Sequence, residues 1–579
     1  MKKSIEPIES RIIYTLDAKC RDCYRCIRGC PVKAISIEKG QAKVEQSRCI
    51  SCGTCVRECP QNAKVFRNDV SKVIELLAGE VTAVAGIAPA FAAYFEPWQR
   101  LRFVSALRMM GFSRVEEVAS AAFAVSAGVR KNYESNPNES YICTACPVSV
   151  FLAEKYYEKA ALYLGKEPSP MIEHAARVKK NNAGEMVYVF FGPCIAKKAE
   201  AERKEYEGLV DAVLTFTETE KLFEHFNINL KACEESSFDS DCYGQSRLYP
   251  IAGGLIQTAY NSIPEFAILA EGHDMTRKAF DASSKYPYLI ETLFCDGGCI
   301  NGPGMNFTVP YSEIPYYERR TRFVKYTQEN NSKESEYTSQ NPILRSRFKY
   351  IGIPEAKTYT QEEINEVWAR TGKSLLEQRL DCGLCGYFDC YQQAVAILDG
   401  RAEGEMCLPY VRRSVEQKTD KIIETTPNGI VTLNSELRII KMNKAFEKLF
   451  KASNYMGKHI GELMDPVPFE SLAIGTSDHL EFTATHPELR LTCNEIYYAI
   501  REDEQYVGIF IDVTRFMDSD RELGRMRKET LEKAKELMEH QVQTAQSMAL
   551  FLGENTAKSE ELLSKLIKLA DEADENEKI

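Results

Sequence analysis

The hydrophobic and polar positions along the chain follow several different periods. Met186 to Phe191 is a continuous apolar run, typical of a strand that is buried on both faces of a parallel sheet. Val73 to Leu77, Leu101 to Met110 and Val115 to Val129 are expected to be helices. Val507 to Thr514 alternates between apolar and polar residues, which predicts a half-buried strand. These mixed periods predict a multidomain α/β and α+β protein.

A seven-residue period marks the end of the chain. The apolar positions that share it, or lie three residues after one of its members, are Leu531, Ala534, Met538, Ala545, Met548 and Leu552. Such a stripe predicts a short coiled-coil-like helix within a helical tail at residues 516–579. The tail would pair with a second copy or with a partner, or pack onto the domain before it.

Length, charge and hydropathy limit the class of protein. A chain of 579 residues indicates several domains, and its net charge of −11 disfavours non-specific binding to nucleic acid. The most apolar stretch, Val81 to Phe95, is too short to span a membrane, and no secretory signal peptide is evident. We therefore expect a soluble, cytoplasmic protein with neither nucleic acid nor membrane as a partner.

Cysteine usage points to metal chemistry. Of the 20 cysteines, 16 fall in motifs with metal-ligand spacing, which in a cytosolic chain indicates metal binding and not disulfides. The other four are expected to be structural thiols; they are Cys143, Cys233, Cys242 and Cys493. Of these, only Cys143 lies close in sequence to a candidate site.

Residues 1–70 predict a ferredoxin-like domain with two 4Fe–4S clusters. Two Cys-x2-Cys-x2-Cys-x3-Cys-Pro motifs occur in it, and in such motifs the fourth cysteine ligates the other cluster. One predicted ligand set is Cys20, Cys23, Cys26 and Cys59. The other is Cys30, Cys49, Cys52 and Cys55. Ala34 to Ile37 and Ala42 to Val44 are expected to be the strands between them, and the expected role is electron transfer.

A further cysteine group lies at residues 355–410. Its members are Cys382, Cys385, Cys390 and Cys407, with the helix-like stretch Tyr391 to Leu398 before the last. The run Cys-Gly-Leu-Cys-Gly-Tyr-x2-Cys resembles the small 4Fe–4S module of several redox proteins. A zinc site is the alternative, although the group contains no histidine.

Residues 411–515 resemble a PAS domain, a sensory α/β fold. Ile422 to Phe450 is expected to form a helix, a turn, two strands and a second helix. Asn443 matches the asparagine frequent at a helix start in that family, and Asp512 and Thr514 match its exit signature. The resemblance implies a signal joint at these three residues, in a domain that transmits or dimerises without a cofactor of its own.

The central domain, residues 75–350, contains three cysteine loops. They are Cys143-Thr-Ala-Cys146-Pro147, Phe191-Gly-Pro-Cys194-Ile-Ala-Lys197-Lys198 and Cys295-Asp-Gly-Gly-Cys299-Ile-Asn-Gly-Pro-Gly304. Cysteine beside proline or glycine suits a tight loop around a bound group. The loops resemble, in order and separation, the three signature loops of the iron-only (FeFe) hydrogenases.

That resemblance implies a composite centre, the H-cluster. Cys146, Cys194, Cys295 and Cys299 would hold a 4Fe–4S cubane, and Cys299 would also bridge to a two-iron subsite that carries CO, cyanide and a dithiolate. Lys197 would donate a hydrogen bond to a cyanide, and Pro89 would form another wall of the pocket. A cluster-only or zinc site without the two-iron unit remains the alternative. With the other motifs, the count is four 4Fe–4S clusters.

The sequence departs from catalytic members of that family at the proton relay. Those members have a cysteine where this chain has Ala145, and a helix glutamate at a position that falls near Ala127. No acid lies between Glu117 and Glu134. Gly192 and Leu293 stand where catalytic members have methionines. A positioned acid–base group contributes roughly 10²–10⁴-fold in rate, so turnover should be slow.

These features favour a hydrogen or redox sensor with slow, reversible hydrogen oxidation, like the sensory, PAS-linked members of the family. The expected partners are H₂, a redox protein such as a ferredoxin, a second copy of the chain, and a kinase or serine phosphatase on another chain. Two alternatives stay open. One is a true catalytic hydrogenase with a different proton path, and the other is an iron–sulfur scaffold without the two-iron subsite.

Overall fold

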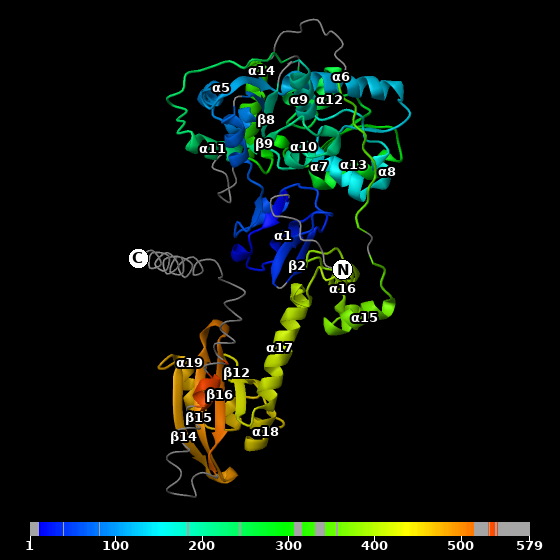
Figure 1. The fold of residues 1–579 in the computed structure, drawn as a ribbon. Helices are drawn as coiled ribbons and strands as arrows, with labels where there is room; N and C mark the ends of the chain where they lie inside the picture. The colour runs from blue at the N-terminus through cyan, green and yellow to red at the C-terminus, as the bar shows by residue number, and fades with distance from the viewer. Residues whose placement is uncertain are drawn as a thin grey trace, which may run out of the picture. The chain divides into compact units, whose positions relative to one another are not determined.

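The computed structural model describes residues 11–38, 40–79, 81–181, 185–242, 245–305, 315–330, 342–354, 357–514, 531, 533–538 and 541. The chain divides into two compact units, Met1–Val411 and Arg412–Ile579 (Figure 1). Among the described residues, no helix is long and apolar enough to cross a bilayer. The predicted coiled-coil-like tail lies outside the described residues, apart from 531, 533–538 and 541.

The first unit begins with a small domain of two antiparallel strand pairs and two short helices. β1 (Ile13–Thr15) pairs with β4 (Lys64–Phe66), and β2 (Ile35–Glu38) pairs with β3 (Gln41–Val44), as the sequence predicts for the two inner strands. Helices α1 (Arg25–Gly29) and α2 (Thr54–Glu58) each end just before a cysteine. Its core of isoleucine, alanine and cysteine side chains surrounds the cysteine loops.

A four-stranded parallel sheet of order β6-β5-β8-β9 forms the centre of the next domain (Figure 1). Its strands are β5 (Thr82–Ile87), β6 (Phe112–Glu117), β8 (Met186–Gly192) and β9 (Ala212–Thr215). From Val187 to Gly192 every residue of β8 is buried, because helices cover both faces of such a sheet. The predicted strand at Met186 to Phe191 is thereby confirmed.

The helices of this domain follow the strands in α/β fashion. They are α3 (Val70–Leu77), α4 (Phe91–Tyr94), α5 (Arg100–Met109), α6 (Ala119–Ser135), α7 (Pro147–Tyr156), α8 (Glu158–Ala161), α9 (Pro170–Lys180), α10 (Ala196–Ala201), α11 (Phe216–His225), α12 (Gly254–Tyr260), α13 (His273–Ser283) and α14 (Tyr316–Glu329). The expectation of one helix over Val115 to Val129 is wrong in its first part. Val115 to Glu117 belong to β6, because short buried strands and helices share the same apolar pattern.

A second, three-stranded parallel sheet lies beside this core, in the order β10-β11-β7. Its strands are β7 (Tyr141–Ile142), β10 (Ala267–Glu271) and β11 (Leu289–Leu293). The small module that follows packs α15 (Gln361–Arg370) against α16 (Cys390–Leu398) through Ile364, Val367, Trp368 and Ala394. The sequence-predicted helix at Tyr391 to Leu398 is thus confirmed.

Helix α17 (Leu408–Thr425) contains the boundary between the two units. The second unit then forms a five-stranded antiparallel sheet of order β13-β12-β16-β15-β14. Its elements are β12 (Gly429–Leu433), β13 (Ile439–Met442), α18 (Lys444–Phe450), α19 (Val467–Ile474), β14 (His479–His486), β15 (Leu491–Ile500) and β16 (Gln505–Asp512). Phe446, Phe450, Phe469 and Phe510 lie in its core. The predicted order from Ile422 to Phe450, helix, turn, two strands and helix, is confirmed.

Candidate metal centre

Each of the three central cysteine loops follows a strand, β7, β8 or β11, of one of the two parallel sheets. Cys146 is the residue before α7, and Pro147 occupies the first position of that helix. Cys194 follows β8, which ends at Gly192. Cys295 follows β11, and Cys299 opens a short 3₁₀ turn. Parallel strands present their carboxyl ends at one edge, where ligand sites of α/β sheets usually lie.

Backbone hydrogen bonds tie the loops together. The N–H of Gly304 in the third loop donates to the carbonyl of Pro193 in the second loop at 2.7 Å. A side chain at Gly302 would place its Cβ 2.6 Å from that same carbonyl, so only glycine permits this approach. The N–H of Cys143 in the first loop donates to Ile290 of β11 at 2.8 Å. All three loops therefore share one space.

The four predicted cubane ligands lie within electrostatic reach of one another. Burial raises the pKa of the Cys194 thiol to about 12, and the neighbouring Cys146 raises it further. Burial also raises the pKa of Cys295 well above its usual value, with added contributions from Cys194, Cys299 and Cys146. Cys194, Cys295 and Cys299 thus have thiols whose ionisation is disfavoured by burial and by neighbouring cysteines, which fits a cationic iron–sulfur core that binds them as thiolates.

No group of three or more His, Cys, Asp or Glu side chains in the described residues could hold a single metal ion, whereas the four thiolates of a cubane each bind a different iron atom.

Lys197 lies between the first and second loops. It is buried in the first turn of α10, and its Nζ donates to Glu200 Oε2 at 2.7 Å and to the Ala145 carbonyl at 3.4 Å. It also lowers the pKa of Cys194 and Cys299, against the larger effect of burial. A cation therefore faces the space beside the thiols, as an anionic ligand would require.

Apolar groups occupy the positions where the sequence departs from catalytic hydrogenases. Ala145 is half-buried against an apolar cluster that includes Leu255 and Leu289. At Gly192, an added Cβ would lie 2.5 Å from the Phe190 ring, so that ring already fills the space of a longer side chain. Leu293 is buried at the end of β11.

Pro89 lies two residues after the end of β5, at the same edge as Cys194, since β5 and β8 are adjacent parallel strands. It is buried, and its carbonyl accepts from Ala92 N–H at 3.2 Å in the turn that starts α4. The structure thus brings Pro89 to the edge where the cysteine loops begin.

Sequence reasoning missed a set of buried polar groups behind the first loop. Glu291, in the fully buried strand β11, accepts backbone N–H groups from Gly253, Leu255 and Ile256, and burial raises its pKa to about 7. The sequence signal that could have identified Glu291 is a carboxylate within an otherwise apolar strand.

Glu167 has no comparable sequence signal, because it lies in a connecting segment. It is buried, and it accepts from Tyr141 OH at 2.5 Å and from the Asn132 amide. Burial, Glu291 and Glu167 together raise the pKa of Cys143. Tyr249 OH lies 2.7 Å from Ser126 Oγ on α6. A thiol, two carboxyls and three hydroxyls therefore cluster near Ala145.

The two predicted ligand sets of the N-terminal domain each surround a small cavity. Cys20, Cys23, Cys26 and Cys59 line one cavity of 20 Å³. Cys30, Cys49, Cys52 and Cys55 line another of 20 Å³. Burial raises the pKa of Cys26 to about 11 and that of Cys55 well above its usual value, each with contributions from cysteines of its own set. The cross-over pairing expected from the spacing is therefore the one the fold brings together.

The four predicted ligands of the small module are less clearly grouped in the structure than those of the dicluster domain. Burial raises the pKa of Cys385, and Cys407 adds to this effect. Cys390 starts α16, and its N–H donates to Asp381 Oδ1 at 2.6 Å. Cys382 is exposed on the preceding loop. The structure thus relates Cys385 to Cys407 directly, and it places the other two on the segment between Asp381 and α16.

Cysteines of neighbouring sites lie close enough to influence one another. Cys52 contributes to the raised pKa of Cys295 in the third central loop. Cys30 and Cys385 both act on Lys33, where they oppose the lowering of its pKa by burial. The second site of the dicluster domain therefore adjoins both the central site and the module.

In the PAS-like unit, Asn443 connects three segments. Its side-chain oxygen accepts from Phe446 N–H and Ile430 N–H, both at 2.9 Å, and its amide donates to Ile423 O of α17 at 2.8 Å. Thr514 N–H donates to Asp512 Oδ1 at 2.9 Å, and Thr514 Oγ1 accepts from Thr492 N–H at 2.9 Å. The predicted joint residues therefore tie α17 and the end of β16 to the sheet.

Known families match four parts of the chain. Residues 81–285 match "Iron only hydrogenase large subunit, C-terminal domain". Residues 12–60 match "4Fe-4S dicluster domain", residues 378–409 match "Putative Fe-S cluster" and residues 417–483 match "PAS domain".

Two curated relatives with the longer alignments are hydrogenases of low identity. Iron hydrogenase 1 of Clostridium pasteurianum is 23% identical over 308 residues, which are 44% of this chain and 54% of the relative. NADP-reducing hydrogenase subunit HndD of Solidesulfovibrio fructosivorans is 21% identical over 401 residues, 58% of this chain and 64% of the relative. The chain thus spans between half and two thirds of the length of these relatives. A solved structure of apo [FeFe]-hydrogenase HydA1 from Chlamydomonas reinhardtii aligns with 49% of this chain and all of its own, at 17% identity and a TM-score of 0.41.

Proposed function

This chain is an iron-only hydrogenase-like iron–sulfur protein with a PAS domain, and from that premise we propose that it senses hydrogen or redox state. One observation carries the proposal. Lys197 lies beside Cys194 and Cys299 and donates to the Ala145 carbonyl, while Ala145, which occupies the proton-relay position, has only a methyl side chain. The metal pocket is kept, and the usual proton donor is absent.

Each pocket residue has a defined part in this proposal. Cys146, Cys194, Cys295 and Cys299 would hold the cubane, and Cys299 would also hold the two-iron subsite with its CO, cyanide and dithiolate ligands. Lys197 would donate a hydrogen bond to a cyanide, and its ion pair with Glu200 holds the ammonium beside the first loop. Pro89 closes one wall. The two-iron subsite, when bound, supplies the chemistry that splits hydrogen reversibly.

In this proposal, proton transfer to and from the subsite limits the rate of hydrogen turnover. A methyl group at position 145 neither donates nor accepts a proton, and the α6 segment around Ala127 offers no carboxylate. A positioned acid–base group contributes roughly 10²–10⁴-fold in rate. A centre that reacts slowly with hydrogen reports its presence without consuming much of it.

Electrons would leave through the neighbouring clusters. The proximity of Cys52 to Cys295, and of Lys33 to both Cys30 and Cys385, supports a path from the central cubane through the dicluster domain to the module. Cys407 directly precedes α17, whose carbonyl at Ile423 is held by Asn443. A charge change at the module would thus reach the PAS domain. A second copy of the chain, a ferredoxin, and a kinase or serine phosphatase on another chain are the proposed partners.

Infrared spectroscopy of the matured protein, with and without hydrogen, tests the proposal. We expect CO and cyanide bands that shift under hydrogen, together with hydrogen-uptake and evolution rates far below those of ordinary hydrogenases. Matured protein that shows no such bands would be a cubane-only scaffold. Rates equal to those of ordinary hydrogenases would contradict the sensor.

A second candidate, a true hydrogenase with another proton path, is favoured by the buried groups behind Ala145. Glu291 has a pKa of about 7, raised by burial, which suits proton exchange at neutral pH. Cys143 and Glu167 are within electrostatic reach of each other. If these groups relay protons, Glu291→Gln lowers hydrogen turnover at least tenfold. Under the sensor proposal, the already slow rate changes less than twofold.

A further inference from the structure

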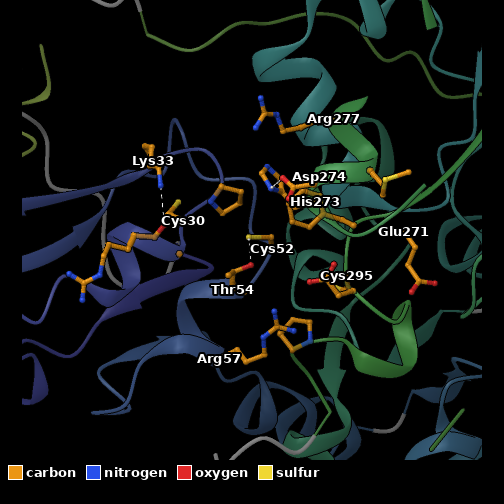
Figure 2. A pocket seen from close by; sticks show the side chains of 18 of the residues that line it. Cys30, Lys33, Cys52, Thr54, Arg57, Glu271, His273, Asp274, Arg277 and Cys295 are labelled. Atoms are coloured by element: carbon orange, nitrogen blue, oxygen red, sulfur yellow. Dashed lines mark hydrogen bonds and ion pairs between the residues drawn. The ribbon is translucent and has the colours of Figure 1, made fainter. Parts of the chain in front are cut away.

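A cavity of 430 Å³ lies between the dicluster domain and the hydrogenase-like domain, and the small module also reaches it (Figure 2). Cys30 and Cys52 line it on one side, and Cys295 lines it on the other. Ligand pockets for small molecules typically enclose about 300–1,000 Å³. The cavity is therefore large enough for a bound metabolite, at a point adjoining two proposed cubanes.

Its walls carry fixed positive charge. The cations are Arg28, Lys33 and Arg57 of the dicluster domain and Arg277 of α13. Figure 2 shows Arg57 and Arg277 at opposite sides of the cavity, with Lys33 between them on the dicluster side. Within the described residues, Lys33 and Arg277 form no ion pair; Lys33 donates to the Arg28 carbonyl at 3.0 Å and Arg277 to Tyr157 OH at 3.1 Å. Their charge is available to an anion.

The N-terminus of α13 opens into the same cavity. His273, Asp274 and Met275, in the first turn of this 11-residue helix, line the wall. Unpaired N–H groups and the helix dipole favour anions at such a position. The His273 side chain is 26% exposed; its Nδ1 lies 3.3 Å from Asp274 Oδ1, and its Nε2 has no hydrogen-bond partner among the described residues.

An aromatic platform completes the wall. Phe388 of the module lines the cavity although 61% of the residue is exposed. Lys33 Nζ lies 5.9 Å from its ring centre and the Arg277 guanidinium 5.7 Å. A nucleotide base can stack on such a ring, as bases do in nucleic-acid-binding proteins, and the cations beside it would hold the attached phosphate.

The cavity wall formed by the hydrogenase-like domain also contains carboxylates, which a ligand of this site must accommodate. Glu271, Asp274 and Asp296 line the cavity, and Glu271 accepts Gly297 N–H at 2.8 Å. They would repel an anion of phosphates alone. Carboxylates commonly accept hydrogen bonds from ribose hydroxyls in nucleotide sites. Cations, an aromatic face and carboxylates together fit phosphate, base and ribose.

We propose that this cavity binds a nucleoside phosphate and thereby links the redox state of the clusters to a phosphorylated metabolite. Each reduced cluster gains one negative charge, so reduction weakens binding of an anion beside it. By reciprocity, the bound nucleotide makes the clusters harder to reduce. The inference rests on the iron–sulfur assignment and not on hydrogen sensing.

Titration calorimetry of the reconstituted full chain under anaerobic conditions tests the site, with ADP, pyrophosphate and adenosine as separate probes. We expect ADP to bind the oxidised protein at least tenfold more tightly than adenosine. Arg277→Gln and Arg57→Gln should each weaken ADP at least tenfold, since a charged hydrogen bond is lost. Arg412→Gln, an exposed arginine in the other unit, is the matched control and should leave ADP binding unchanged.

Phe388→Ala separates base stacking from phosphate binding. It should weaken ADP at least fivefold and leave pyrophosphate unchanged, whereas Phe482→Ala, an exposed phenylalanine of the PAS-like unit, should alter neither. Because Phe388 is exposed, this variant tests the site even if an arginine variant loses its clusters, which iron content would reveal.

Redox titration provides the second readout. If ADP binds the oxidised form tenfold more tightly than the reduced form, it lowers a cluster midpoint potential by 59 mV. If the cations serve only to balance the charge of the clusters, the arginine variants shift the potentials, but ADP does not bind at about 1 mM. That result, or equal ADP affinity in wild type and all cavity variants, overturns the proposal whether or not the protein senses hydrogen.

Discussion

At the scale of single residues, position 145 has a methyl side chain where a cysteine would place a proton donor beside the two-iron subsite. Ala145 is half-buried next to Cys146, and its carbonyl already accepts from Lys197. A cysteine side chain adds one sulfur to that methyl, so the loop can accommodate the change with little rearrangement. Position 145 therefore offers a direct test of the sensor proposal.

We expect Ala145→Cys to raise hydrogen turnover of the matured protein at least tenfold, because it restores a thiol beside the subsite. Gas chromatography of hydrogen evolved with a chemical reductant measures the change. Ala145→Val, which adds volume without a proton, should give no gain. An unchanged rate in the cysteine variant, with intact infrared bands, counts against the relay argument.

Lys198, the residue after Lys197, stabilises the fold and does not face the proposed metal pocket. Its ammonium is fully buried and forms ion pairs with Asp69 Oδ2 at 2.9 Å and with Glu218 Oε1 at 3.0 Å. Removing one partner of a buried ion pair leaves uncompensated charge and typically costs about 3–5 kcal/mol.

Lys198→Met should therefore lower the thermal midpoint of the hydrogenase-like domain by several degrees, with calorimetry as the measurement. Lys221→Met, an exposed lysine on α11, serves as control and should stay within about 1 °C of wild type. An unchanged thermal midpoint in the Lys198 variant would mean that its two carboxylate partners become neutral at little cost in folding free energy.

At the scale of elements, strand β11 carries an acid whose titration should show in stability. Burial raises the pKa of Glu291 to about 7, although three backbone N–H groups oppose the shift. The folded state thus holds this proton more tightly than the unfolded state. The stabilisation, about 3 kcal/mol, is complete below the unfolded pKa of about 4.5 and is lost as pH rises through 7.

The thermal midpoint of wild type should therefore fall between pH 5.5 and pH 7.5, and Glu291→Gln should flatten that fall because an amide does not titrate. Scanning calorimetry across this range measures both. Equal pH profiles for the two proteins would show that the folded-state pKa of Glu291 is not raised into this range.

Helix α17 is the second element with a testable part. Its end is held to the PAS sheet by Asn443, whose amide donates to Ile423 O, and Lys441 forms an ion pair with Asp420 of the same helix. Asn443 is fully buried. Asn443 thus connects α17 to β12 and to the start of α18 through buried hydrogen bonds.

Asn443→Ala should abolish redox-dependent changes in the PAS domain, because α17 loses its buried anchor. Hydrogen exchange of the full chain, compared between oxidised and reduced protein, measures these changes in β12 and β16. Asn434→Ala, in an exposed turn of the same sheet, should preserve them. Preserved changes in the Asn443 variant would place the signal route elsewhere.

At the scale of the whole molecule, four cysteine sites adjoin in one unit and predict its iron content. Before the two-iron subsite is inserted, four cubanes give about 16 iron atoms per chain. Alanine in place of Cys23, Cys55, Cys194 or Cys385 should lower this by about four, since each cubane needs four thiolates. Colorimetric iron analysis decides. Cys493→Ala should leave the content unchanged, because Cys493 is buried in the PAS core.

The sequence by itself determined which cysteines belong together in the dicluster domain. Motif spacing is local, and a loop of two or three residues allows few ways to surround a cubane, so the cross-over sets were predictable. It also determined β8, from a continuous apolar run, and the last PAS strand, from alternating apolar residues that record which face is buried. The helix expected from Val115 failed at its start, since a short buried strand carries no such period.

Only the tertiary structure decided what surrounds Ala145 and what lies between the clusters. Cys143, Glu167 and Glu291 are far apart along the chain, and their meeting depends on how β7, β11 and the segment before α9 pack. The cavity lined by Arg57, Arg277 and Phe388 likewise draws on three domains. Long-range neighbours leave no pattern in a single sequence, because their spacing is fixed by packing and not by the local geometry of helix, strand or turn.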